Sequence, residues 1–299
     1  MHIKRILVAT DFSETAKKTV EQALVLASRY QAELVVLHAR ILFDDDPGRL
    51  SDQIQELKQE EREAEEAILQ CARENTAMHE HLNIHHEITR GYSAPSAVLR
   101  YLNENEFDLA LIGTHGKSGL EQLLLGSVAE KVVRYAPCPI LTFSKYATVK
   151  EKFSRIFVPF DFSKHAQKAL QTALTLCDIP GEVQMIYVID ERVSTLHSSW
   201  GVKTMKEMVP DIFNKAEQEM DNIAAALQNP QKIKITKKIL EGQTHKELAR
   251  YINHTNCDLV VASTHGLVGL DRFLLGSTTE RLIRSVHKPI LTIKQKNLI

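Results

Sequence analysis

The chain has 299 residues, of which 43% are hydrophobic and 25% are charged, a composition typical of a globular protein with about two domains. The 37 basic and 38 acidic residues give a net charge of −1, which argues against a protein built mainly to bind nucleic acid or an anionic membrane. No apolar stretch approaches the ~18 residues of a membrane-spanning helix, and the apolar run at 6–9 is too short for a secretion signal. We therefore expect a cytoplasmic protein without a membrane segment.

The four cysteines, at positions 71, 138, 177 and 257, form no Cys-x-x-Cys pair and have no zinc-like spacing. They are expected to be reduced and mostly buried thiols. Four histidines cluster at 79, 81, 85 and 86. His85 and His86 would point to opposite sides of a strand, so the sequence predicts no metal site there.

Strands and helices are predicted to alternate along the first half of the chain. Hydrophobic periodicity predicts strands at 3–9, 34–39, 84–89, 108–113 and 139–143, and helices at 14–30, 51–75, 94–104 and 127–135. Continuous apolar strands in β-α-β order indicate a parallel sheet with helices on both faces. Ligands of such sheets bind at the carboxyl ends of the strands.

The second half repeats the first at a shift of 150 positions. Asp11-Phe12-Ser13 recurs as Asp161-Phe162-Ser163, and nine of the fifteen positions in 113–127 are identical to those in 263–277. The repeat predicts strands at 155–160, 183–189, 233–240, 258–263 and 289–294, and helices at 164–177, 204–228, 245–254 and 277–286. This is a domain duplication. We expect two α/β domains, 1–148 and 149–299, joined near the polar stretch 146–152.

An acid follows the first strand of each half, Asp11 in one and Asp161 in the other. Such a residue, with the serine two positions later, can cap the following helix. It can also accept a hydrogen bond from a ribose hydroxyl or a base amino group. Recurrence does not decide between these interpretations, because duplication copies caps as well.

A glycine loop follows the fourth strand of each half: Gly113-Thr114-His115-Gly116, nine residues, then Gly126-Ser127. Glycines let the backbone approach a ligand closely, and free amides at a helix start favour a phosphate. A capping box between Ser127 and Glu130 would compete for those amides, as would Ser277 and Glu280 in the second half. Two glycine clusters near a strand-end acid favour a nucleotide.

The tripeptide Gly116-Lys117-Ser118 is not a Walker A motif, because the glycine required five residues earlier is replaced by Leu111. Lys117 is still a candidate phosphate contact in the first half. His115 and His265 have no evident oriented partner, so a role in shaping the loop is favoured over general base catalysis. The sequence predicts no catalytic residue.

The pattern G-x2-G-x9-G-[ST] after the fourth strand, with Thr-Asp-Phe-Ser after the first, resembles the universal stress protein family. The resemblance occurs once in each half and together covers essentially the whole chain. It implies two Rossmann-like domains, each with a five-stranded parallel sheet of order 3-2-1-4-5. It also implies a cytoplasmic regulatory stress-tolerance protein that binds ATP, with or without magnesium. The alternatives are a weak ATP hydrolase or nucleotide-transferring enzyme, and a ligand-free dimerisation scaffold.

The resemblance also implies one adenine-nucleotide pocket in each half. The residues carried over to the first pocket are Ala9, Thr10, Asp11, Ala39, Gly113, Thr114, His115, Gly116, Lys117, Ser118, Gly119, Gly126, Ser127, Val128 and Ala129. Those of the second are Pro159, Phe160, Asp161, Val188, Ser263, Thr264, His265, Gly266, Gly276, Ser277, Thr278 and Thr279. The second departs from the pattern at Ser263 and Phe160, so the first site is expected to be more intact.

Members of that family often dimerise through the last strand of the domain. The resemblance therefore implies an intramolecular pseudo-dimer that pairs Ile140–Phe143 with Ile290–Ile293, alone or within a homodimer. No nucleic acid or membrane partner is expected.

Overall fold

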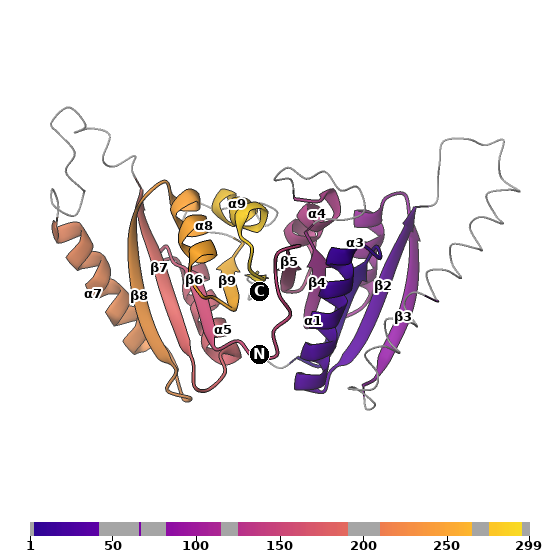
Figure 1. The fold of residues 1–299 in the computed structure, drawn as a ribbon, viewed down its shortest axis with the longest axis horizontal. Helices are drawn as coiled ribbons and strands as arrows, with labels where there is room; N and C mark the ends of the chain where they lie inside the picture. The colour runs from indigo at the N-terminus through magenta and orange to yellow at the C-terminus, as the bar shows by residue number, and fades with distance from the viewer. Residues whose placement is uncertain are drawn as a thin grey trace, which may run out of the picture. The chain divides into compact units, whose positions relative to one another are not determined.

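The computed structural model describes residues 3–41, 66, 82–114, 125–190, 210–264 and 275–294. The chain divides into two compact units, residues 2–151 and 152–299, each with its own sheet and helices (Figure 1). The predicted helix at 51–75 lies outside the described residues, apart from the helical Glu66.

The first unit contains a parallel sheet of five strands in the order β3-β2-β1-β4-β5, which confirms the predicted order. Its described elements are β1 (Arg5–Thr10), α1 (Glu14–Tyr30), β2 (Glu33–Ile41), β3 (Ile84–Gly91), α3 (Ala94–Glu104), β4 (Leu109–Gly113), α4 (Ser127–Tyr135) and β5 (Ile140–Phe143). Helix α1 packs on β1 and β4, while α3 packs on β2 and β3 and also contacts α4. The predicted boundaries agree with the observed ones within about two residues.

The second unit repeats this sheet as β8-β7-β6-β9-β10. Its described elements are β6 (Arg155–Pro159), α5 (Lys164–Leu176), β7 (Glu182–Asp190), α7 (Pro210–Ala226), β8 (Lys234–Gly242), α8 (Thr244–His254), β9 (Leu259–Ser263), α9 (Ser277–Ser285) and β10 (Ile290–Ile293). The α/β architecture predicted from the alternation of elements is therefore confirmed in both halves.

Burial explains why the central strands are continuous apolar runs. Ile6, Leu7 and Val8 of β1 are at most 1% exposed, so both faces of this strand are buried, and α1 packs on it. At the edge strand β3, exposed and half-buried residues alternate from Ile84 to Ile88. Because β1 pairs in parallel with both β2 and β4, the carboxyl ends of these three strands lie at the same edge of the sheet.

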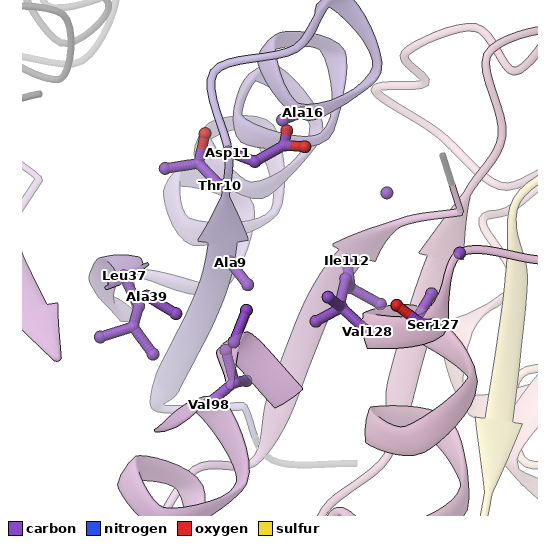
Figure 2. Close-up of a pocket in the computed structure, with 14 residues that line it drawn as sticks. Ala9, Thr10, Asp11, Ala16, Leu37, Ala39, Val98, Ile112, Ser127 and Val128 are labelled. Carbon is purple, nitrogen blue, oxygen red and sulfur yellow. The ribbon is translucent and has the colours of Figure 1, made fainter. Parts of the chain in front are cut away.

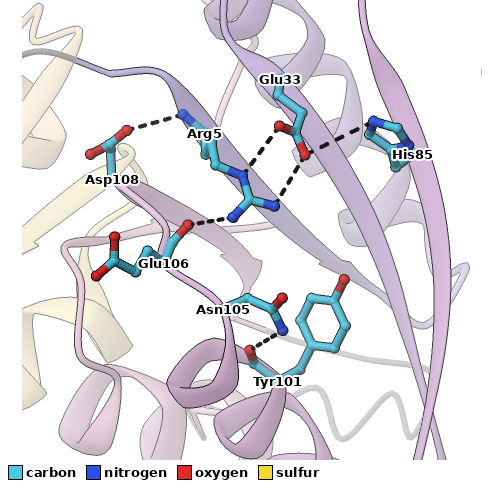
Figure 3. A network of polar contacts seen from close by, with 7 residues as sticks. All are labelled: Arg5, Glu33, His85, Tyr101, Asn105, Glu106 and Asp108. Atoms are coloured by element: carbon cyan, nitrogen blue, oxygen red, sulfur yellow. Dashed lines mark hydrogen bonds and ion pairs between the residues drawn. The ribbon is translucent and has the colours of Figure 1, made fainter.

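A network of polar contacts lies at the amino-terminal edge of the first sheet, opposite the carboxyl ends of the strands (Figure 3). The guanidinium of Arg5 pairs with Glu33 at 3.1 Å and lies over the ring of Phe107. The carboxylate of Asp108 accepts the backbone amides of Lys4 and Arg5 at 2.7 and 3.0 Å. These contacts tie the starts of β1, β2 and β4 together, so their role is structural.

The segment after β5 is held against α1. The side chain of Gln22, which is fully buried, donates to the carbonyl of Lys150 at 2.9 Å and accepts its amide at 2.8 Å. Ala147, in the same segment, is 2% exposed. The stretch at 146–150, expected as part of a polar junction, is thus packed onto the first unit.

Three cysteines, Cys138, Cys177 and Cys257, are buried, whereas Cys71 lies outside the described residues. Burial raises the pKa of Cys257 to about 12. None of the helices in the described part of the chain is both long and apolar enough to cross a membrane.

Candidate functional site

A cavity of about 320 Å³ lies at the carboxyl end of the first sheet (Figure 2). Its walls come from β1, β2, β4, α1, α3 and α4 and from the turn after β1. The lining residues are Ala9, Thr10, Asp11, Ala16, Leu37, Ala39, Ala94, Val98, Ile112, Gly113, Gly126, Ser127, Val128 and Ala129. One part of the wall is apolar, around Leu37, Ala39 and Val98, and Asp11 and Ser127 bring polar groups. This is the position at which parallel α/β sheets bind ligands.

The turn between β1 and α1 places Asp11 on the cavity wall. Ser13 is the N-cap of α1, and its hydroxyl accepts the amide of Ala16 at 3.2 Å. Asp11 accepts the amide of Ser13 at 3.1 Å, and the N-cap residue is Ser13 and not Asp11. The capping interpretation is thus correct for the serine, and the carboxylate lines the cavity.

The amino terminus of α4 forms the opposite wall. Gly126 is the N-cap of α4, Ser127 is its first residue, and glycine has no side chain with which to cap the helix. The Glu130 carboxylate instead pairs with Arg134 at 3.3 Å. The capping box considered from the sequence is therefore wrong, because the helix begins at Ser127, one residue earlier than that motif requires.

The same correction applies to the second half. Gly276 is the N-cap of α9 without a side-chain cap, and Glu280 pairs with Arg284 at 2.7 Å. Backbone amides at a helix start carry partial positive charge and favour an anion. Both α4 and α9 thus present backbone amides that favour an anion at the end of the glycine loop. Ser127 and Ser277, the first residues of these helices, are exposed to solvent.

The structure brings most of the predicted first-half residues into one cavity. Thr114 does not line it: the residue is 2% exposed, and its carbonyl accepts the amide of Gly126 at 2.8 Å. His115, Gly116, Lys117, Ser118 and Gly119 lie outside the described residues, as do His265 and Gly266 of the second half.

Sequence reasoning missed five lining residues, namely Ala16, Leu37, Ala94, Val98 and Ile112. Each is a small or apolar residue in a helix or strand and carries no motif. The one available signal was proximity to strand ends, since Leu37 lies two residues before Ala39 and Ile112 lies directly before Gly113.

The second half differs at the corresponding positions. Phe160, which replaces Thr10, is 4% exposed, and its ring packs edge-on against Phe162 at 5.5 Å. Thr279, which replaces Ala129, donates its hydroxyl to the carbonyl of Ser263 at 2.7 Å. That hydrogen bond ties α9 to the end of β9.

The turn after β6 repeats the turn after β1. Asp161 accepts the amide of Ser163 at 3.1 Å and also its hydroxyl at 2.5 Å. Pro159 ends β6, and Val188 is buried in β7. Burial and, secondarily, the charge of Asp161 raise the pKa of Tyr187.

The histidines at 85 and 86 do not converge. His85 is exposed and lies 3.9 Å from Glu33, whereas His86 is half-buried, with a pKa lowered by burial and by His85. Within the described residues, no group of three metal-ligating side chains gathers. His79 and His81 lie outside those residues.

Comparisons with known proteins agree with this architecture. The profile of the universal stress protein family matches residues 2–144 and 152–294. Universal stress protein MJ0577 of Methanocaldococcus jannaschii is 31% identical over 158 residues, covering 48% of this chain and 97% of the relative. MJ0531 of the same organism is 32% identical over 149 residues, covering 48% of this chain and 83% of the relative.

Among solved structures, a universal stress protein from Archaeoglobus fulgidus superposes over 98% of this chain and 99% of its own, with a TM-score of 0.66 and 22% identity. That likeness extends the shared fold to the full length of both chains. The two profile matches cover both units, each with its own parallel sheet. The chain therefore belongs to the universal stress protein family and carries two family domains in tandem.

Proposed function

We propose that the first half of the chain binds ATP in the cavity at the carboxyl end of its sheet. The observation that carries this proposal is the wall composition of that cavity. Apolar residues, the Asp11 carboxylate and the start of α4, whose N-cap Gly126 has no side chain, all face one space of about 320 Å³. Small-molecule sites typically occupy ~300–1,000 Å³ and combine apolar walls with a few polar groups.

The proposed pose follows from the chemistry of the walls. Adenine, a flat apolar ring, would lie against Ala9, Leu37 and Ala39. The carboxylate of Asp11 would accept a ribose hydroxyl. The phosphates would lie at the amides of Ser127 and Val128, where the α4 dipole favours negative charge. The family resemblance adds 113–119 to the proposed phosphate and ribose contacts.

We propose further that the second half binds ATP more weakly or not at all. Ser263 stands where the first half has Gly113, and its carbonyl is tied to Thr279. Val188 is bulkier than Ala39, which reduces the room for a base. Occupancy of one half would shift the conformational equilibrium of the protein, as a regulatory factor in stress tolerance requires. The proposed role is thus binding rather than turnover.

Native mass spectrometry of the purified chain, followed by titration calorimetry with ATP and magnesium, tests this proposal. We expect one ATP per chain. Asp11→Asn is expected to weaken binding about tenfold, because a hydrogen bond to a charged group contributes ~1.5–3 kcal/mol. Asp161→Asn is the matched control and should leave the affinity unchanged. Absence of ATP binding by the wild-type chain, or an equal loss in both variants, would contradict the assignment.

A further inference from the structure

The turn that presents Asp11 to the cavity contains a backbone conformation that is rare for a bulky residue. Phe12 has a φ of 63°, in the left-handed region. Phe162, its counterpart in the second half, has a φ of 64°. Such conformations are unfavourable for residues other than glycine, and they persist where the surroundings hold them.

Two hydrogen bonds within the turn contribute to holding it. The Phe12 amide donates to the Thr10 hydroxyl at 3.1 Å, and the Ser13 amide donates to Asp11 at 3.1 Å. Both bonds are local, however, and neither reaches the rest of the sheet. One contact that does so comes from β2.

His38 of β2 contacts the turn at two points. Its ring lies 4.7 Å from the Phe12 ring, with an interplanar angle of 38°. Its Nδ1 lies 2.9 Å from the Thr10 carbonyl oxygen, within hydrogen-bond distance. Thr10 and His38 are register partners in the sheet, so strand pairing sets this position. Within the described structure, His38 is not among the residues that line the cavity.

The second half builds the same contact with a different side chain. Tyr187 lies next to Ile186, the register partner of Pro159, and corresponds to His38. Its ring lies 4.8 Å from the Phe162 ring at an interplanar angle of 69°. An aromatic ring from the second strand thus packs on the left-handed phenylalanine in both halves. The ring contact is retained although histidine and tyrosine differ in hydrogen bonding.

We infer that His38 is a positioning residue for the nucleotide: by packing on Phe12 it keeps the turn in its left-handed conformation and the Asp11 carboxylate on the cavity wall. The chain direction explains the coupling, because Asp11 immediately precedes Phe12. A change of φ at Phe12 changes the path of the chain between Asp11 and the N-cap Ser13. This inference rests on the proposed function for its effect on binding.

The binding experiment uses the full-length chain and three variants, titrated with ATP and magnesium. His38→Ala removes the ring and is expected to weaken ATP binding about tenfold. His38→Tyr supplies the ring that the second half uses, and it is expected to restore affinity to within about twofold of wild type. Tyr187→Ala removes the equivalent ring in the second half, and it should leave ATP affinity unchanged.

Each alternative outcome overturns the inference. Wild-type affinity in His38→Ala would mean that the ring does not position the turn. Equal weakening in His38→Tyr and His38→Ala would mean that ring packing is not the contact that matters. Equal weakening in Tyr187→Ala would indicate general destabilisation of the chain.

A second measurement needs no nucleotide and separates this inference from the proposed function. Crystal structures of the wild-type chain, of His38→Ala and of His38→Tyr give φ of Phe12 directly. We expect Phe12 to leave the left-handed region in His38→Ala and to keep it in His38→Tyr. A left-handed Phe12 in His38→Ala would overturn the inference, whatever the chain binds. Failure of the wild-type chain to bind ATP, with the expected shift of φ, would overturn only the proposed function.

Discussion

The amide of Gly126 donates a hydrogen bond to the carbonyl oxygen of Thr114 at 2.8 Å, and this bond joins the two ends of the glycine loop. Gly276 and Thr264 form the same bond at 2.7 Å in the second half. Both threonines are 2% exposed, so the base of each loop is fixed in the core. The start of each following helix is thereby held close to the end of the fourth strand of its half.

Close approach of the backbone favours glycine at this bond. A Cβ atom on Gly126 would lie 3.1 Å from the Thr114 oxygen, and one on Gly276 would lie 3.2 Å from the Thr264 oxygen. Gly126→Val is therefore expected to displace the start of α4 and to weaken ATP binding at least tenfold, measured by titration calorimetry. Gly276→Val has the same steric cost and serves as the control. Equal loss in the two variants would place the nucleotide elsewhere.

The bidentate contact of Gln22 with Lys150 leads to a prediction about stability. Gln22→Ala would leave the backbone amide and carbonyl of Lys150 without these partners, so we expect a loss of ~1–3 kcal/mol in the free energy of unfolding. Urea denaturation of the full chain measures it. Lys18→Ala removes the exposed bond to Lys145 and should change the free energy by less than ~0.5 kcal/mol. A Gln22 variant as stable as Lys18→Ala would contradict the argument.

Asp108 and its counterpart Asp258 each accept two consecutive backbone amides. Those bonds measure 2.7 and 3.0 Å for Asp108, and 3.1 and 2.9 Å for Asp258. We expect Asp108→Ala to destabilise the chain by ~1–3 kcal/mol in urea, and Asp108→Asn, which keeps an acceptor oxygen, by less. Because the network lies at the amino-terminal edge of the sheet, ATP affinity of the folded variant should stay at the wild-type value.

The buried thiol of Cys257 predicts a pH dependence. Burial raises its pKa to about 12, above the ~8.5 of an unfolded chain. Above pH ~8.5 the thiol ionises in the unfolded chain but stays neutral in the folded one, which favours unfolding. The contribution of Cys257 to the free energy of unfolding is therefore fully present below pH ~8.5 and is lost as pH rises towards 12. Cys257→Ala should therefore show a smaller loss of unfolding free energy between pH 8 and 10 than the wild-type chain. Identical slopes for the two proteins would contradict the assignment.

The same pKa predicts slow alkylation of Cys257. A thiol reacts with iodoacetamide as the thiolate, which is rare at pH 8 when the pKa is about 12. Peptide mapping after a short treatment at pH 8 should find Cys257 unmodified in the native chain and modified in urea. Rapid labelling in the native chain would show that the site opens readily.

Pairing of Ile140–Phe143 with Ile290–Ile293 stays a prediction from the duplication and the family resemblance. Sedimentation velocity of the full chain is the direct measurement. A chain that satisfies this contact internally is expected to sediment as a monomer at micromolar concentration. A mutation such as Thr142→Arg, which places a charge at a residue 1% exposed in β5, would test whether the strand is needed for that state.

The sequence by itself determined the duplication, the type and approximate bounds of the described elements, and the positions of Asp11 after β1 and of Gly126 before α4. These features depend on local periodicity and on residues that interact with near neighbours. The order of the strands came from the family resemblance, since several orders fit the same alternation of strands and helices.

Only the tertiary structure decided which groups meet. It placed Gly126 rather than Ser127 at the N-cap of α4. The capping role of each residue depends on the exact residue at which the helix begins, and the sequence pattern does not fix that residue. It brought Val98 of α3 into the cavity and His38 onto Phe12. These contacts join segments far apart in the chain, and strand register and helix packing set them, whereas the local sequence pattern does not.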